Sequence, residues 1–140
     1  MPSNPPEWAL AFVHAARVGR LATSSAAAEP HVIPCVYVLL DDAIYSVVDE
    51  KPKFGRRLLR LRNIDATGKA ALVVDHYEED WSRLAYVLIR GPASVIDSAD
   101  PRHTPALAAL RAKYPQYREM ALEDAEMVVL EAERWVAWRG

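Results

Sequence analysis

The sequence predicts a mainly β protein with flanking helices, arranged as a six-stranded antiparallel barrel. Short stretches rich in β-branched residues follow one another along the chain with turn signals between them, which favours antiparallel pairing and barrel closure. A doubly wound parallel sheet would need a helix after nearly every strand, and the helical patterns are too few for that. A length of 140 residues, with no repeat or linker, predicts a single domain over residues 1–140.

The first half of the chain is expected to contain a helix, three strands and a second helix, over residues 7–17, 18–23, 31–40, 43–48 and 51–64. The first helix can form an apolar face from Trp8, Phe12 and the alanines, and the prolines before it are tolerated at a helix start. The second strand is rich in valine, which suits burial on both faces. Asp41-Asp42 predicts a tight turn, and leucines at helical spacing predict the second helix.

The second half is expected to contain two long strands, a helix and a last strand, over residues 69–77, 84–97, 100–114 and 125–138. Asn63 and the Thr67-Gly68 pair are expected to end the helix over 51–64 before the first of these strands. Gly91-Pro92 predicts a bend or bulge inside the second strand. Pro101 lies at the start of the helix, and Pro115 ends it because proline cannot continue a helix.

The composition limits the classes of partner. The apolar fraction of 51% and the charged fraction of 26% are typical of a soluble domain, which at this length buries roughly 70% of its unfolded surface. A net charge of −2 gives no overall attraction to nucleic acid or to an acidic membrane. Cys35 is the one cysteine, so neither an intrachain disulfide nor a thiolate-rich zinc site can form. With no signal-peptide pattern and no apolar run near the ~18 residues of a membrane span, we expect a cytoplasmic protein without a metal.

The segment 51–62 concentrates positive charge in a chain whose total charge is slightly negative. It contains six basic residues and no acid: Lys51, Lys53, Arg56, Arg57, Arg60 and Arg62. Like charges at helical spacing repel one another, and a multiply charged anion would relieve that repulsion. The planar fork of arginine suits phosphate because it can donate two charge-assisted hydrogen bonds. The alternative is a solvated helix face that forms ion pairs with acids elsewhere, such as Glu78, Glu79 and Asp80.

A second cluster of chemistry-bearing residues spans 75–83, at a strand end where binding residues often lie. Trp81 stands in a polar loop, where it could cover a flat ring, contact a second subunit or simply pack. His76 could act as a general acid or could be hydrogen-bonded at the strand end, and Tyr77 or a water is an equal candidate. No nucleotide-binding glycine loop, zinc-protease motif or nucleophile elbow is present, so no catalytic residue is assigned.

Several short motifs occur in a recognisable order, and they span nearly the whole chain. They are Arg20-Leu21-Ala22-Thr23, Pro30-His31-Val32-Ile33-Pro34, Ile44-Tyr45-Ser46, Lys51-Pro52-Lys53 and Leu61-Arg62-Asn63-Ile64. Their order resembles the pyridoxamine 5′-phosphate oxidase-like superfamily, whose fold is an FMN-binding split β-barrel. Four later motifs resemble its small branch of enzymes that use coenzyme F420: Asp75-His76-Tyr77, Asp80-Trp81-Ser82-Arg83-Leu84, Tyr114-Pro115-Gln116-Tyr117 and Arg134-Trp135.

The resemblance implies a homodimer with cofactor sites at the interface between its subunits. It assigns the cofactor phosphate to the basic residues after the third strand, Lys51, Lys53, Arg57 and Arg60. It places the ring system against the second and third strands, near Pro34, Cys35, Val36 and Ser46, with Trp81 as a further candidate contact. The implied cofactor is F420, with FMN as the alternative.

The function that this resemblance implies is that of an F420-dependent oxidoreductase, which transfers a hydride between the deazaflavin and a small electron-poor organic substrate. An FMN-dependent oxidoreductase and a non-catalytic cofactor carrier are the alternatives. The resemblance does not extend to the arginine-rich C-terminal motif of pyridoxamine-phosphate oxidase itself, because only Arg134 and Arg139 are available there. A nucleic-acid module is not expected, since the total charge is near zero and no aromatic cluster flanks the basic segment.

Overall fold

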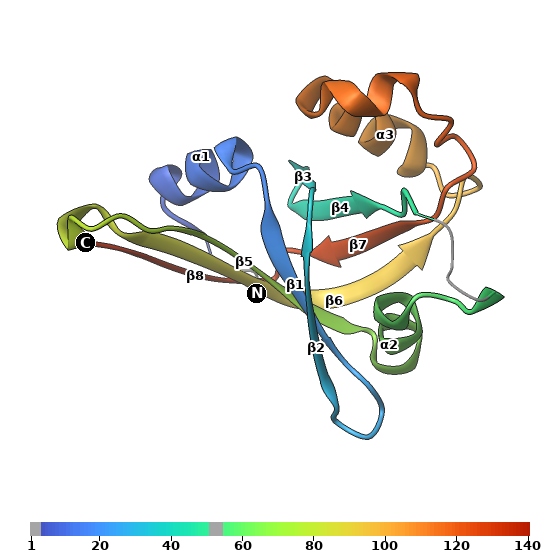
Figure 1. The fold of residues 1–140 in the computed structure, drawn as a ribbon, viewed down its shortest axis with the longest axis horizontal. Helices are drawn as coiled ribbons and strands as arrows, with labels where there is room; N and C mark the ends of the chain where they lie inside the picture. The colour runs from blue at the N-terminus through green and yellow to red at the C-terminus, as the bar shows by residue number, and fades with distance from the viewer. Residues whose placement is uncertain (1–3, 51–54) are drawn as a thin grey trace.

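The computed structural model describes residues 4–50 and 55–140, and this part of the chain is mainly β with helices at its flanks (Figure 1). The elements are α1 (Glu7–Ala15), β1 (Gly19–Ser24), β2 (Pro30–Cys35), β3 (Val38–Leu40), β4 (Ala43–Val47), α2 (Leu59–Thr67), β5 (Lys69–His76), the 3₁₀ turn η2 (Trp81–Arg83), β6 (Ala85–Ile96), α3 (His103–Lys113), the 3₁₀ turn η3 (Pro115–Glu119), β7 (Met127–Glu131) and β8 (Arg134–Arg139). The predicted class is therefore confirmed.

The predicted count of six strands is wrong, because the described residues form an 8-stranded sheet. Two of the expected strands are each broken into two. The strand expected over 31–40 is interrupted at residues 36 and 37, so that β2 pairs with β1 while β3 pairs with β4. The strand expected over 125–138 is interrupted at residues 132 and 133, between β7 and β8. Both breaks occur where the chain turns from one part of the sheet to another, as strands do at barrel corners.

Every strand pairing is antiparallel, in the order β2-β1-β5-β6-β7-β4-β3, with β8 also paired to β6. Strand β6 is 12 residues long and joins the two halves of the sheet. Its first half lies between β5 and β8, and its last four residues pair with β7. Strands β7 and β8 therefore follow each other along the same edge of β6.

The irregularity predicted at Gly91-Pro92 lies opposite these residues, where β7 passes into β8, while β6 itself runs unbroken from Ala85 to Ile96. Residues 91 and 92 of β6 lie opposite residues 131–133, so the opposing strand has one extra residue, as in a β-bulge. A Cβ atom at Gly91 would lie 2.0 Å from the backbone oxygen of Glu131. Only glycine leaves room for that approach.

Two apolar cores lie on opposite faces of β4 and β7. Val128 and Leu130 belong to the core inside the barrel, which α1 and α2 also contact. Met127 and Val129 belong to the second core, under α3. Because side chains alternate along a strand, β7 is buried on both faces, and burial of this kind stabilises the fold by roughly 1.5–3 kcal/mol per large apolar side chain.

Hydrogen bonds from two tyrosines hold the corner between β2 and β3. Tyr37 is fully buried, and its hydroxyl donates to the Val13 carbonyl of α1 at 2.6 Å. The Tyr114 hydroxyl accepts from the Tyr37 backbone N–H at 3.3 Å and lies 3.0 Å from the Arg17 carbonyl, to which it can donate. The Tyr114 hydroxyl thus satisfies the backbone N–H of Tyr37 at the corner, and the other two bonds tie the corner to α1 and to the residues that precede β1.

Helix α2 begins later and ends later than the predicted range 51–64. It starts at Leu59 and ends at Thr67, where Gly68 adopts a left-handed φ of 66° and donates its N–H to Ile64. Asn63 does not end the helix, because its side chain is buried and donates to the Thr23 hydroxyl at 3.1 Å. The helix is tied in this way to β1.

An arm made of β5, β6 and β8 extends from the barrel, at the left of Figure 1, with η2 at its tip. One face of this arm exposes large apolar side chains, among them Tyr86, Val136 and Trp138. The rings of Tyr86 and Trp138 stack with their centroids 6.0 Å apart. None of the described helices is long and apolar enough to cross a membrane.

Among the described residues, the Lys113 ammonium is the one buried side-chain polar group without a hydrogen bond. Its Nζ lies 4.1 Å from the centroid of the Tyr37 ring. Burial, and secondarily the charge of Arg17, lowers the pKa of Lys113 to about 8. Between that value and the ordinary lysine pKa, the unfolded chain binds more protons than the folded chain, so stability rises with pH.

We therefore predict that wild-type protein gains about 1–2 kcal/mol of unfolding free energy relative to Lys113→Met between pH 7.5 and 10, allowing for solvent screening of a half-buried group. Urea unfolding of both proteins at several pH values measures the difference. The Met variant serves as the control for tyrosines that titrate in the same range. Parallel pH profiles for the two proteins would contradict the assignment.

Candidate functional site

A cleft of about 440 Å³ lies at the corner between β2 and β3, and we call it the corner cleft. Its walls come from the end of β2, from β4 and the residues after it, from α2 and from η3. The lining residues are Val18, Ile33, Pro34, Cys35, Val36, Ser46, Val47, Asp49, Glu50, Arg60 and Tyr117. Five of the predicted site residues are thus brought together: Pro34, Cys35, Val36, Ser46 and Arg60.

Cys35 and Ser46 face each other across the cleft wall. The Ser46 hydroxyl donates to the Val36 carbonyl at 3.0 Å, which orients it beside the last residue of β2. Burial raises the pKa of the Cys35 thiol, although the hydrogen bond with Ser46 and the charge of Arg60 act in the opposite direction. The thiol is therefore protonated at neutral pH and is a weak nucleophile.

Arg60 supplies the positive charge of the corner cleft. Its side chain is 14% exposed and forms an ion pair with Glu50, with Nη1 at 3.2 Å from Oε1. A guanidinium has five N–H donors, and within residues 4–50 and 55–140 this is the one ion pair that Arg60 makes. Donors remain available for an anion in the cleft.

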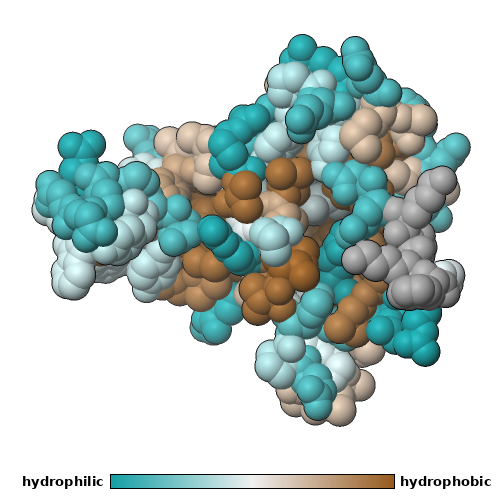
Figure 2. Space-filling view, in the orientation of Figure 1, coloured by the Kyte–Doolittle hydropathy of each residue, from teal (hydrophilic) through white to brown (hydrophobic). Residues whose placement is uncertain are grey.

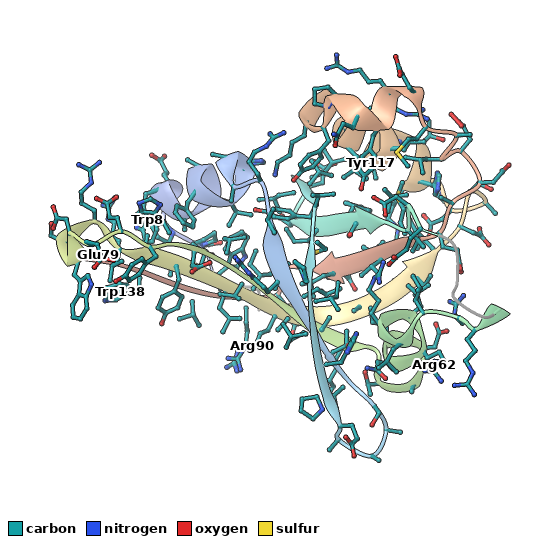
Figure 3. The ribbon with its side chains drawn as sticks, in the orientation of Figure 1. Trp8, Arg62, Glu79, Arg90, Tyr117 and Trp138 are labelled. Atoms are coloured by element: carbon teal, nitrogen blue, oxygen red, sulfur yellow. The ribbon has the colours of Figure 1, made fainter. Side chains whose placement is uncertain are left out.

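Tyr117 and Asp49 form a short hydrogen bond at the other side of the cleft. The Tyr117 hydroxyl donates to Asp49 Oδ2 at 2.6 Å. Burial of the ring, and secondarily the Asp49 carboxylate, raises the pKa of Tyr117, so the phenol stays protonated. The tyrosine lies between α3 and β4 (Figure 3).

Sequence reasoning missed the three polar residues Asp49, Glu50 and Tyr117. The two acids directly precede the basic segment, and Tyr117 ends the motif that follows α3. The local signal for Tyr117 is Pro115 at the start of η3, which indicates that the chain turns there.

Arg57 is not brought into the corner cleft. Its Nε lies 3.0 Å from Asp65, and its Nη1 lies 2.8 Å from Glu126. These ion pairs agree with the alternative prediction, in which the basic residues pair with acids elsewhere in the chain. The acids are Asp65 and Glu126 and not the expected Glu78, Glu79 and Asp80. The remaining predicted phosphate ligands, Lys51 and Lys53, lie outside the described residues.

The tip of the arm, at η2, also lies far from the corner cleft of the same chain (Figure 3). Trp81 is 67% exposed in η2, and Glu79 marks the tip at the opposite side of the molecule from Tyr117 (Figure 3). His76 pairs with Glu78 at 2.5 Å, in the same loop. Within one chain, neither Trp81 nor His76 can touch a ligand in the corner cleft.

The donor set fits a flavin-type cofactor and does not fit a metal. The volume lies in the range of small-molecule sites, and Val18, Ile33, Pro34 and Val36 offer apolar walls for a ring. Arg60 offers a fork for a phosphate, and the two acids of the lining are already bound, Glu50 by Arg60 and Asp49 by the Tyr117 hydroxyl. No group of His, Cys, Asp and Glu side chains in the described part of the chain could hold a metal ion.

Comparison with known proteins gives a family and a fold. The family model for pyridoxamine 5′-phosphate oxidase matches residues 6–139. None of the curated proteins matches the chain.

Among solved structures, a conserved hypothetical protein from Mycobacterium tuberculosis is 19% identical with a TM-score of 0.75, over 97% of this chain and 86% of that one. A FAD-binding protein from Mesorhizobium loti is 18% identical with a TM-score of 0.68, over 93% and 91%. The haem storage protein of Vibrio cholerae is 12% identical with a TM-score of 0.69, over 93% and 90%. At these identities, the likeness shows a shared split-barrel fold.

We predict that the Cys35 thiol reacts with a disulfide reagent at least about tenfold more slowly than a free cysteine at pH 7.5, because burial keeps it protonated. A ligand that fills the corner cleft should slow the reaction further. The colour released by the reagent measures the rate, and protein unfolded in guanidinium gives the unhindered control. A rate equal to that of the unfolded protein would show that the thiol is open to solvent.

Proposed function

The chain belongs to the pyridoxamine 5′-phosphate oxidase family, and from that premise we propose that it is an F420-dependent oxidoreductase whose cofactor binds in the corner cleft. The observation that carries the proposal is the position of Arg60, a largely buried guanidinium with free donors in a cleft walled by β2 and β4. The bound deazaflavin would supply hydride transfer to or from a small electron-poor substrate. One reduced thiol, Cys35, suits a cytoplasmic protein.

The chain itself would bind and orient the cofactor. Arg60 would donate to the phosphate, and Lys51, which directly follows Glu50 in the sequence, and Lys53, two residues further, would add charge there. The segment Pro34–Val36 would lie along the ring and exclude water from one of its faces. The phenol of Tyr117, held protonated beside Asp49, is a hydrogen-bond donor that could orient a ring oxygen or a substrate.

FMN is the alternative cofactor, and the name of the similar Mesorhizobium loti protein supports a flavin in general. Haem is a further alternative, since a similar protein stores haem. Haem iron needs an axial ligand such as histidine, thiolate or tyrosinate. The described lining holds no histidine, and both Cys35 and Tyr117 stay protonated. A non-catalytic carrier would bind F420 but would transfer no hydride to any acceptor.

A parallel binding titration with F420, FMN, FAD and haem tests the proposal. Wild-type protein should bind F420 most tightly, and Arg60→Gln should weaken that binding about 10- to 100-fold through the loss of charge-assisted hydrogen bonds. Arg62→Gln is the matched control, because Arg62 is exposed on the same helix and does not line the corner cleft. Equal affinities for the two variants, with both folded, would remove Arg60 from the site.

We also propose that the protein is a homodimer and that the exposed face of the arm contacts the second copy. Tyr86, Val136 and Trp138 are 39%, 39% and 46% exposed on that face. Contiguous exposed apolar groups are uncommon on monomers and usually mark an interaction surface. Figure 2 shows apolar side chains gathered over the middle of the molecule, between the polar arm tip and the polar opposite side. A second copy would also offer its own arm tip, with Trp81, to the corner cleft.

The change Val136→Ser with Trp138→Ser should therefore convert a dimer into a monomer at micromolar concentration. Light scattering during size-exclusion chromatography measures the mass, and circular dichroism checks the fold. Cofactor affinity should fall in the same variant if the second copy completes the site. A wild-type protein that is already monomeric, or a variant that stays dimeric, would exclude this face as the interface.

A further inference from the structure

A second cleft of about 800 Å³ lies on the exposed face of the sheet, and we call it the basic cleft. It lies where β1 ends, where α2 passes into β5, and where β6 runs alongside the junction of β7 and β8. It shares no lining residue with the corner cleft. The basic cleft is therefore separate from the proposed cofactor site, although Arg90 and Arg134 leave the same face of β6 and β8 as Tyr86, Val136 and Trp138.

Two arginines stand next to each other at the edge of the basic cleft. The register of β6 and β8 places Arg90 directly opposite Arg134, so their side chains leave the same face of the sheet. Like charges directly opposite each other destabilise a strand pair. In the chain apart from residues 1–3 and 51–54, neither guanidinium forms an ion pair or a hydrogen bond.

Lys69 adds a third positive charge to the same cleft. The register pairs Lys69 with Pro92, two residues beyond Arg90 along β6, and side chains two residues apart in a strand share a face. Glu133 also lines the cleft but forms no ion pair with these three residues. The charged side chains that line the basic cleft therefore carry a net charge of +2, although the net charge of the whole chain is −2.

The floor of the basic cleft is apolar and smooth. Ala22, Ala71 and Pro92 form it, and the register aligns Ala22, Ala71 and Arg90 across neighbouring strands. Figure 3 shows the Arg90 side chain pointing away from the arm, on the side opposite to Trp8. Side chains this small leave room above the strands for part of a ligand while the cations remain at its edge.

We propose that the basic cleft binds an organic anion that carries at least two phosphate or carboxylate groups. The guanidinium forks of Arg90 and Arg134 would each take an acid group in two hydrogen bonds, and the Lys69 ammonium would contribute a third contact. Binding would remove the repulsion between the two arginines, which gives the site a physical reason to prefer a divalent ligand. The apolar floor would contact the body of that ligand.

Isothermal titration with pyrophosphate and with citrate, at pH 7 and low salt, tests the proposal and separates the two acid chemistries. Wild-type protein should bind at least one probe, and Arg90→Gln with Arg134→Gln should weaken that binding at least about tenfold. The matched control is Arg62→Gln, another exposed arginine without an ion pair, which should bind like wild type. Probe bound at the corner cleft should be lost in Arg60→Gln and kept in the double variant, because Arg60 lines only that cleft, so the two variants separate the two sites.

Thermal unfolding provides a second measurement. The bound probe should raise the midpoint of wild-type protein and leave that of the double variant unchanged. Without a probe, the double variant should unfold at the same temperature as wild type or higher, because it lacks the repulsion between the two arginines.

Three outcomes would overturn the proposal. One is the failure of both probes to bind wild type, and another is equal binding by the double variant. The third is loss of the dimer in the double variant with anion binding retained, which would assign the arginines to the contact with a second copy.

Discussion

A close approach between β6 and the end of β7 is the constraint on which the architecture depends. The backbone oxygen of Glu131 lies where the side chain of any residue other than glycine at position 91 would begin. Because Gly91 leaves that space empty, two strands can follow each other along one edge of β6. Strand β7 then continues the sheet to β4 and closes the barrel, while β8 continues along the arm. A residue with a side chain would force the two apart.

The corner between β2 and β3 explains where a ligand can enter. At this corner the backbone leaves one pairing partner for another, and the Tyr114 hydroxyl, which accepts from the Tyr37 backbone N–H, takes the place of a strand partner. The residues just before the corner, Cys35 and Val36, therefore face a cleft as well as a neighbouring strand. The same turn that closes the barrel exposes the lining of the candidate cofactor site.

The arginines of the basic segment show how position decides the role of a charge. Arg57 precedes α2 and is engaged by Asp65 and Glu126. Arg60 lies one residue inside the helix and faces the corner cleft. Arg62 is two residues further, about 200° around the helix axis, and faces solvent. Residues of one type, within six positions of one another, therefore bind an acid, line a cleft or stay exposed.

Much of the fold follows from local patterns in the sequence. The mainly β class, the tight turn at Asp41-Asp42, where both residues have positive φ, and the bulge at Gly91 all depend on neighbours along the chain. The strand count did not follow, because valine-rich segments have the same pattern whether or not a corner interrupts them. Helix α2 was misplaced because Asn63 resembles a helix end until its contact with Thr23 is known.

The sequence by itself determined the order of the elements, the family and five residues of the corner cleft, since these depend on local composition and on motifs. Only the tertiary structure decided that Tyr117 meets Asp49, 68 residues away, and that Arg90 stands opposite Arg134. It also decided that Arg57 turns away from the cleft. Such contacts are set by strand register and barrel closure, which join distant segments, and no local periodicity carries that information.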